Sequence, residues 1–261
     1  MLYIIKLLNI IQSIWGGQMQ RRTLLATGIV FLLVGTYGLY AVGYPQYPEV
    51  KDCVNPFEVV KHLNSVQENW SRVHIFFKLV TSRDFWKLAK PWNVDYSNVK
   101  VVKHVLEYNG ENITMIAIGI PLKDKKHVVA LYEFSKPVQG VKVRGYLIEL
   151  SQGKLVPRLI SVNGGKLTAL SNCRHECKSN SDCSYPREFC TKYCCSYDRD
   201  YAIDCCLAAG RCGAVCGVGA TVCLVNPIGC IACTVCVIAN CYDCIEKSCL
   251  EWGSGCEYHG A

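Results

Sequence analysis

The C-terminal part of the chain is a run in which cysteine recurs and charge is missing. Twelve of the nineteen cysteines lie in residues 204–256, and no charged residue stands between Arg211 and Asp243. At about 100° per residue, four cysteines of each half gather on one helical face: Cys205, Cys212, Cys216 and Cys223 in the first half, and Cys230, Cys233, Cys241 and Cys244 in the second. Asn226-Pro227 separates the halves, because proline does not continue a helix. The sequence therefore predicts two helices that form a hairpin with disulfides across its seam.

Glycine and alanine are frequent in the first half of this run. Small side chains let helices approach closely, which disulfides require: their Cα atoms stand roughly 4.4–6.8 Å apart, whereas helix axes usually pack about 8–10 Å apart. Each bridge would contribute roughly 2–4 kcal/mol and offset the low helix propensity of glycine. A buried hairpin with free thiols is the alternative, and the density of cysteines disfavours it.

A second cysteine group precedes the hairpin. Residues 173–195 hold six cysteines in an otherwise polar stretch, which is typical of a loop-rich disulfide knot. Six and twelve are both even, so we expect each group to close on itself and to leave Cys53 alone. Residues 196–204 between the groups are expected to form a linker and a processing site. The expected disulfide cysteines, with their pairing open, are Cys173, Cys177, Cys183, Cys190, Cys194, Cys195, Cys205, Cys206, Cys212, Cys216, Cys223, Cys230, Cys233, Cys236, Cys241, Cys244, Cys249 and Cys256.

The N-terminal residues indicate export. Codons for residues 15–18 can contain a ribosome-binding sequence just upstream of Met19, so residues 1–18 are expected to be a mis-annotated upstream extension. Arg21 and Arg22 precede 21 uncharged residues, which predicts that residues 19–43 are a twin-arginine-type signal peptide or an uncleaved membrane anchor. Either way the remainder is expected to be secreted or anchored outside the cytoplasm, where disulfides persist.

Residues 44–170 contain one cysteine and are rich in β-branched and aromatic residues. Turn pairs such as Asn109-Gly110 separate the runs, which predicts an antiparallel meander with helical cover. Asn55 is expected to cap a helix that continues to Trp70. The fold class is then α+β, with this domain followed by a six-cysteine module and linker at 171–203 and the hairpin at 204–261. The expected strands are 99–108, 113–120, 128–134, 141–150 and 155–162.

Catalytic and metal-binding motifs are hard to find. Histidines His62, His74, His104 and His127 show no metal-ligand spacing, and no G-x-S-x-G, P-loop or Rossmann glycine pattern occurs. We therefore expect no enzymatic activity, no catalytic residue, no cofactor and no nucleic-acid partner. A thiol–metal site is the alternative, because C-x2-C spacings recur at residues 230–236 and 241–244. Export and the apolar residues between these cysteines favour disulfides.

The segments CGAVCGVGATVC, NPIGC and CIACTVCVIANC resemble the C-terminal peptide of halocin-type bacteriocin precursors from archaea. The layout is similar as well: a twin-arginine-like signal, a middle domain and a small Cys-rich peptide. In that family the mature peptide kills related cells, and the upstream part of the precursor confers immunity. The resemblance covers residues 204–256 and, by layout, 19–170; the insert at 173–195 and the larger number of cysteines depart from the family. It implies a secreted antimicrobial precursor whose partner is a target-cell membrane or receptor.

The two parts of the chain carry opposite net charges. Residues 44–172 hold 18 basic and 11 acidic groups, whereas residues 173–261 hold seven basic and ten acidic groups. Opposite fields orient partners, so we expect a contact between the middle domain and the tail that neutralises the peptide until cleavage. An envelope-anchored structural or interaction protein is the alternative. The expected contact residues are Lys123, Lys125, Lys126, Lys142 and Arg144 against Asp243, Glu246 and Glu251.

Overall fold

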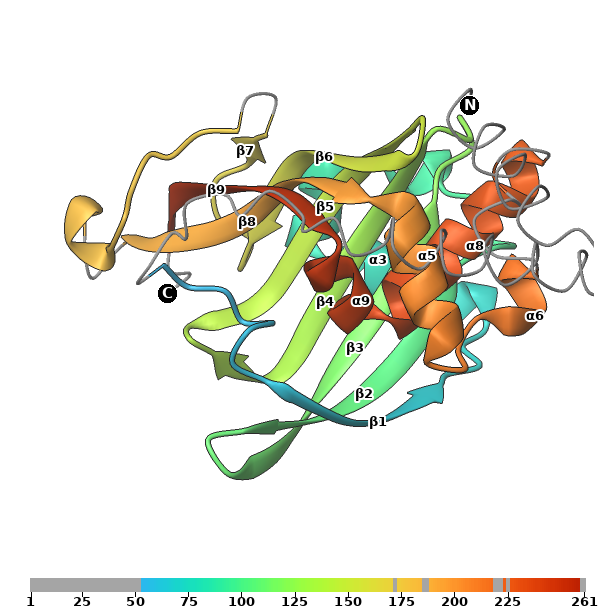
Figure 1. Cartoon of the computed structure of the whole chain (residues 1–261), viewed down its shortest axis with the longest axis horizontal. Helices are drawn as coiled ribbons and strands as arrows, with labels where there is room; N and C mark the ends of the chain where they lie inside the picture. Colours follow the sequence, from blue (N-terminus) through green and yellow to red (C-terminus); the bar gives the residue numbers. More distant parts are fainter. Residues whose placement is uncertain (1–52, 171–172, 185–187, 218–222, 224–225, 259–261) are drawn as a thin grey trace, which may run out of the picture. The chain divides into compact units, whose positions relative to one another are not determined.

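A nine-stranded antiparallel sheet organises the part of the chain that the computed structural model describes, residues 53–170, 173–184, 188–217, 223 and 226–258 (Figure 1). The order across the sheet is β1-β2-β3-β4-β5-β6-β8-β9, and β7 pairs with β6. The expected extension 1–18 and the expected signal 19–43, with Arg21 and Arg22, lie outside the described residues. The strands are β1 (Lys61–Gln67), β2 (Lys100–Tyr108), β3 (Glu111–Pro121), β4 (His127–Val138), β5 (Val141–Ser151), β6 (Lys154–Val162), β7 (Thr168–Ala169), β8 (Glu188–Asp198) and β9 (Cys249–Tyr258).

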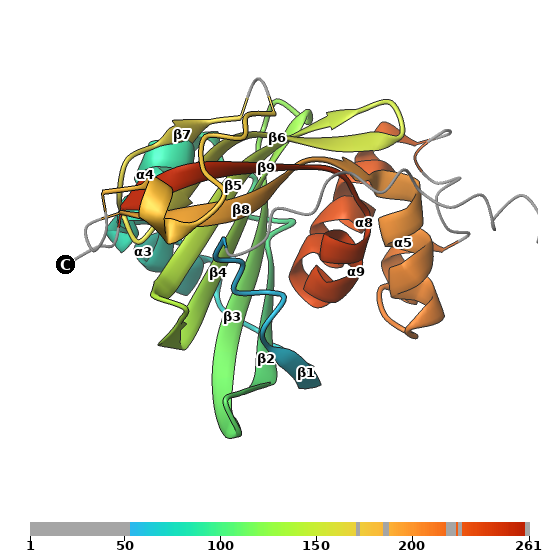
Figure 2. The same ribbon diagram turned by 60° about the vertical axis from the view of Figure 1, so that its left-hand side comes forward.

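Helices cover both faces of the sheet. Figure 2 shows α3 and α4 on one side of the strands and α5, α8 and α9 on the other. Two short 3-10 turns, η1 (Pro91–Asn93) and η2 (Asn180–Asp182), complete the described helical elements. The α-helices are α3 (Arg72–Thr81), α4 (Arg83–Leu88), α5 (Arg199–Ala208), α6 (Gly213–Cys216), α8 (Pro227–Asn240) and α9 (Tyr242–Lys247).

The predicted meander is confirmed. Strands β2 to β6 match the five expected runs, and neighbouring strands pair antiparallel along the chain. The β2–β3 turn has positive φ at both Asn109 (52°) and Gly110 (78°), and the β4–β5 turn repeats this at Gln139 (48°) and Gly140 (84°). Two central residues with positive φ match the twist of flanking strands, which is why such turns close tight hairpins.

Side chains of the central strands point alternately to the two faces of the sheet, and each face forms a hydrophobic core. On one face Ile118 and Leu131 pack with Leu79 of α3 and Phe85 of α4. On the other face Ala117, and residues that alternate with it, pack with the helices of the tail. Because successive side chains of a strand point to opposite faces, the near-continuous burial of β3 and β4 follows from cover on both sides.

The predicted helix from Asn55 to Trp70 is wrong. Asn55 does accept from the Phe57 amide at 3.2 Å, but the chain makes only a turn there and then forms β1. Strand β1 pairs antiparallel with β2, from Lys61 opposite Glu107 to Gln67 opposite Val102. The open edge of β2 offers a ladder of main-chain hydrogen bonds, and such tertiary pairing overrides a weak helical preference.

The tail forms the predicted hairpin with more breaks than expected. Helix α8 begins at Pro227, and the Asn226 side chain accepts from the amides of Ile228 and Gly229 at 3.1 and 3.0 Å, as a helix cap does. The first half is divided into α5 and α6 around Gly210 (φ 72°) and Cys212 (φ 58°), and the second half ends at Cys241 and restarts as α9. None of the described helices is long and apolar enough to cross a lipid bilayer.

Candidate functional site: the contact between sheet and tail

Five disulfides connect the two halves of the hairpin in nested order. Earlier cysteines of the first half pair with later cysteines of the second, as antiparallel helices require. Their Cα atoms stand 4.4–5.9 Å apart, inside the usual range for a disulfide. The short helices of the tail are therefore held by covalent bonds along the whole seam. The pairs are Cys205–Cys244, Cys206–Cys241, Cys212–Cys236, Cys216–Cys233 and Cys223–Cys230.

The expectation that the six-cysteine group closes on itself is wrong. Cys183 pairs with Cys256, and Cys194 pairs with Cys249, so both bonds join β8 and its preceding loop to β9 beyond the hairpin. The reason is that β9 returns alongside β8 as its antiparallel partner, from Glu188 opposite Tyr258 onwards (Figure 1). Cys173–Cys195 does stay within the group. Residues 173–258 are thus one cross-linked unit.

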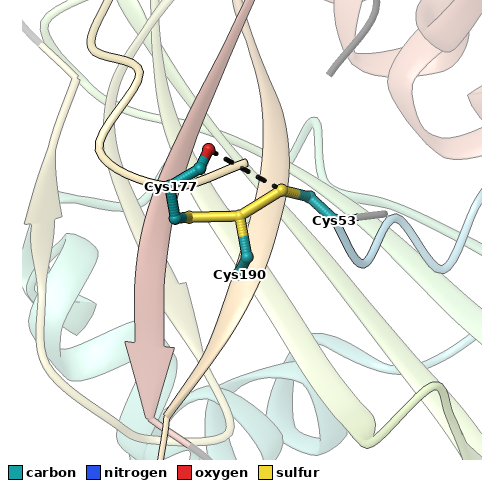
Figure 3. A group of neighbouring side chains, drawn as sticks. All are labelled: Cys53, Cys177 and Cys190. Atoms are coloured by element: carbon teal, nitrogen blue, oxygen red, sulfur yellow. Dashed lines mark hydrogen bonds between the residues drawn. A yellow bond between two sulfur atoms is a disulfide. The ribbon is translucent and has the colours of Figure 1, made fainter. Parts of the chain in front are cut away.

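Cys53 is not left alone. Its sulfur lies within bonding distance of the Cys190 sulfur, and the Cys177 sulfur lies equally within reach of Cys190, which can pair with one of them at a time (Figure 3). All three sulfurs lie within 4.8 Å of one another. Because Cys53 is the single cysteine of residues 44–170, it provides the only disulfide between the sheet domain and the tail.

The expected linker at residues 196–204 is also wrong. Ser196 to Asp198 belong to β8, and α5 begins at Arg199 with the Asp198 side chain accepting from the Tyr201 amide at 3.0 Å. Asp198 and Tyr197 pair with Lys154 and Leu155 of β6, and Tyr197 is fully buried. Polar composition suggested a loop here, but Tyr197 of β8 and both Ala202 and Ile203 of α5 are buried in the core.

Helix α8 lies against the face formed by β2, β3 and β4, with Val235 and Ile238 completely buried. The approach is close at Gly119, where a Cβ atom would stand 2.6 Å from the Val235 carbonyl oxygen. Glycine inside a strand often marks such an approach; that signal was present in the sequence and would have identified this contact.

Two side chains of the sheet bind main-chain groups of α8. The Tyr132 hydroxyl donates to the Ile238 carbonyl at 3.2 Å, and His104 Nε2 lies 2.8 Å from the Ala239 carbonyl. Both side chains are buried. Buried carbonyls near the end of a helix need donors, and the sheet supplies them here. Neither role is visible from the sequence, because it depends on which strand positions face the helix.

A buried polar cluster joins the sheet to α9. Arg144 of β5 is 1% exposed and donates to the Lys192 carbonyl at 2.6 Å and to Asn55 Oδ1 at 3.4 Å. The amide group of Asn55 in turn donates to Glu246 at 3.1 Å. Burial raises the pKa of Glu246, and Arg144 and the Asn55 hydrogen bond partly oppose that rise. Asn55 therefore connects a basic group of the sheet with an acidic group of the tail.

The rest of the expected charge contact is not formed. Lys125 and Lys126 are exposed in the β3–β4 turn, and Lys123 donates to the Trp92 carbonyl. Lys142 donates to the Ser135 carbonyl. Asp243 pairs within the tail, with Arg211 at 3.1 Å, and Glu251 lies on β9. Of the expected residues, the structure brings together Arg144 and Glu246. Burial of apolar side chains therefore positions α8. The exposed lysines do not contribute, because they stay hydrated on the surface.

A cavity of about 400 Å3 lies beside this contact, and aromatic and acidic residues line it. Two of the lining rings, those of His62 and Tyr242, contact the buried ring of His104, with centroids 5.5 and 5.2 Å from it. Burial lowers the pKa of His104 to about 4, and burial together with Arg211 lowers the pKa of His62. Both imidazoles are therefore neutral at neutral pH. The lining residues are Phe57, Glu58, Val60, His62, Tyr242, Asp243, Glu246, Lys247 and Trp252.

The two other histidines of the sheet domain, His74 and His127, lie away from this contact. His74 stacks on Trp70, and His127 bonds to Asp124 at 2.7 Å in an exposed turn. The cysteines with ligand-like spacing, at residues 230–236 and 241–244, all form seam disulfides, which leaves no thiolate for a metal there. The extensive disulfides mark a covalently stabilised Cys-rich protein of the kind found in oxidising, extracellular surroundings.

Comparison of the chain with protein-family models, with curated proteins and with solved structures finds no match. The site therefore stands on its own geometry: an apolar, disulfide-stitched hairpin whose long helix is covered by the sheet.

Proposed function

We propose that the chain is an exported precursor of a Cys-rich antimicrobial peptide, and that the sheet domain neutralises the peptide by covering α8. The observation that supports this is the burial of α8 against β2, β3 and β4. A 14-residue helix without a charged residue has its apolar side hidden in the sheet core. Such a surface, once exposed, partitions into membranes or binds a receptor.

The active unit under this proposal is residues 173–261. Two disulfides, Cys183–Cys256 and Cys194–Cys249, join the chain on either side of residues 196–204. A cut at 196–204 would therefore leave the hairpin attached to β8. A cut just before Cys173 instead yields a unit that keeps the hairpin, β8 and β9 together.

Charge does not direct this unit to anionic lipid. Residues 173–261 carry seven basic and ten acidic groups, so they are net acidic. Basic peptides gain about 1 kcal/mol per basic residue at such surfaces, and that attraction is absent here. The target is therefore reached through apolar insertion or through a receptor on related cells.

The test compares the intact chain with the same chain cut at one place. A protease recognition sequence replaces residues 171–172, and the purified protein is assayed before and after cleavage for growth inhibition of related strains and for leakage of neutral lipid vesicles. We expect activity only after cleavage and separation of the two parts. The matched control carries a scrambled recognition sequence and receives the same protease.

The alternative is an envelope-anchored structural or interaction protein. What favours it is that β8 continues the main sheet through its pairing with β6, so the tail shares both the sheet and its core with the middle domain. That reading predicts no inhibition and no leakage from any separated fragment. Loss of inhibition on adding the sheet fragment back to an active tail would instead support neutralisation.

A further inference from the structure

We infer that Cys53, Cys177 and Cys190 form a thiol–disulfide exchange site in which Cys190 pairs alternately with Cys177 and with Cys53. A sulfur atom forms one disulfide at a time, yet Cys190 lies in bonding contact with both neighbours (Figure 3). The other sixteen cysteines form eight separate pairs. Nineteen is odd, so one thiol remains in a chain that pairs only with itself, and it remains in this group of three.

Main-chain contacts hold Cys53 beside Cys190 without help from a disulfide. The next residue, Val54, donates its amide to the Cys190 carbonyl at 2.6 Å and accepts from the Lys192 amide at 2.9 Å. Val54 forms a parallel bridge with Thr191. The Cys53 sulfur therefore stays within reach when its bond to Cys190 opens.

Cys177 is held on the other side by β9. The Ser254 hydroxyl donates to the Cys177 carbonyl at 2.5 Å, and the Glu176 amide donates to the Ser254 carbonyl at 3.0 Å. Cys190 itself is fixed by its place in β8 and by its amide, which donates to Asn180 Oδ1 at 2.9 Å. Both competing sulfurs are thus positioned by the fold, and exchange needs only side-chain movement.

The step is an isomerisation and needs no oxidant or reductant. The Cys177 thiolate attacks the Cys190 sulfur, the Cys53–Cys190 bond breaks, and its electron pair leaves on Cys53, which takes up the proton that Cys177 lost. The reverse step restores the first state. The attacking species is the thiolate, so the rate rises with pH.

The two states differ in what they connect. With Cys177–Cys190 formed, all eighteen cysteines of the tail pair within the tail, and the thiol is on Cys53, which is partly exposed. With Cys53–Cys190 formed, the tail is covalently bound to the sheet domain, and the thiol is on Cys177, which is 3% exposed. The exchange site is therefore a covalent latch between the two parts. Its role in releasing a peptide rests on the proposed function; the exchange does not.

Labelling the full chain without reduction tests the exchange. Thiols are trapped with N-ethylmaleimide in acidic denaturant, and the labelled peptides are quantified by mass spectrometry. We expect about one label per chain, divided between Cys53 and Cys177 with none on Cys190. In the native protein the label should accumulate on Cys53 with time. The form with its free thiol on Cys177 should decrease as exchange converts it, and this conversion should be faster at mildly alkaline pH. Label confined to one of the two cysteines, or three thiols with a bound metal ion, would overturn the inference.

A pair of variants tests the latch in the chain cut at residues 171–172. On a non-reducing denaturing gel, Cys53→Ser should separate into two fragments, whereas Cys177→Ser should migrate as one species until reductant is added. The unsubstituted chain should show both forms, in the proportion given by the labelling. Peptide mapping of the eight other disulfides confirms that each variant has folded. The gel reports the latch and growth inhibition reports the proposed function, so either can fail alone. One fragment pattern shared by both variants would overturn the latch.

Discussion

Different interactions stabilise the sheet domain, residues 53–170, and the tail, residues 173–258. The sheet domain has one cysteine, long strands joined by tight turns, and apolar side chains on both faces. The tail has eighteen cysteines, and the α-helices that the structure describes in it, α5, α6, α8 and α9, are 4 to 14 residues long. Helices that short are marginal in water, so covalent bonds must do for the tail what packing does for the sheet.

The comparison also shows where covalent bonding stops being sufficient. Disulfides fix the distance between the two halves of the hairpin, but they leave one side of α8 apolar. That side, with Val235 and Ile238, lies in the same core cluster as Ala117 and Tyr132 of the sheet. The tail takes its internal shape from its disulfides and its position from the sheet.

Complete reduction of the disulfides should produce the largest difference between the two regions. Each bridge contributes roughly 2–4 kcal/mol, so the five seam bridges together contribute about 10–20 kcal/mol, which is comparable with the about 5–15 kcal/mol that stabilises a typical domain. We expect α5, α8 and α9 to lose protection from amide exchange, while α3, α4 and β2–β5 keep theirs. Hydrogen exchange with mass spectrometry, with and without reductant, measures this region by region. Equal loss in both regions would show that the sheet domain depends on the tail.

Local pattern was sufficient to predict the meander of β2 to β6 in the sheet domain. The five strands and the turns at Asn109-Gly110 and Gln139-Gly140 follow from alternation and turn residues that neighbours in sequence decide. Helix α8 was also predictable, because Asn226-Pro227 is a local start signal. The strand β1 was not, since residues 61–67 take that form only because β2 presents an open edge to them.

Cysteine pairing in the tail could be predicted only where the helical face determined it. The existence of the seam follows from that face, although Cys206 and Cys236 lie off it and still join the seam. Cys183–Cys256 and Cys194–Cys249 depend on β9 returning beside β8, across more than fifty residues of sequence. The contact residues Asn55, His104 and Tyr132 are equally non-local. Counting even groups of cysteines could not reveal such pairs, because counting carries no information on which strands become neighbours.

On the acid side, the stability of the protein should depend on pH through His104, at the contact between the two regions. Burial lowers its pKa from 6.5 to about 4, so the unfolded chain binds more protons between these values. Stability from this group is full above pH 6.5 and is lost as the pH falls towards 4, by ~3 kcal/mol. Thermal unfolding of the chain and of His104→Gln should therefore diverge across this interval, with the substituted chain less sensitive to acid.

The pKa of Glu257 on β9 shifts in the opposite direction, so this residue is an internal control. Burial raises its pKa from 4.5 to about 7, so its contribution is full below pH 4.5 and is lost as the pH rises through 7. Glu257→Gln should reduce the decline on the neutral side, to which the buried Glu246 also contributes, and leave the contribution of His104 on the acid side unchanged. Identical profiles for both substitutions would contradict the assignment of these two groups.

Gly119→Ala should separate the two regions without touching a disulfide. The added Cβ would stand 2.6 Å from the Val235 main-chain oxygen, and that oxygen belongs to a helix that cannot yield locally. We expect a loss of about 1–3 kcal/mol, with faster exchange of the α8 amides. The matched control is Gly145→Ala on the opposite face, where the new Cβ meets the flexible end of Leu88. Its effect should fall on α4 and leave α8 unchanged.

The smallest expected effect is that of Tyr132→Phe. The Tyr132 hydroxyl donates to the Ile238 carbonyl at 3.2 Å inside the core, and the ring packs edge-on against Phe57 at 5.0 Å between centroids. Phenylalanine keeps the ring contact and removes only the hydroxyl. The expected loss is about 1 kcal/mol, the usual net value of one hydrogen bond, measured as a lower midpoint in thermal unfolding.

Tyr96→Phe makes this prediction specific to the contact, because it removes a comparable bond from the other side of the sheet. The Tyr96 hydroxyl donates to the Pro91 carbonyl at 3.0 Å, beside α3 and away from the tail. Both substitutions should lower the unfolding temperature slightly, but only Tyr132→Phe should speed amide exchange at the end of α8. Because the tail is positioned by contacts and shaped by disulfides, this local loosening should leave the seam amides of α5 unaffected. Faster exchange throughout the tail would mean that the sheet also maintains the internal shape of the hairpin.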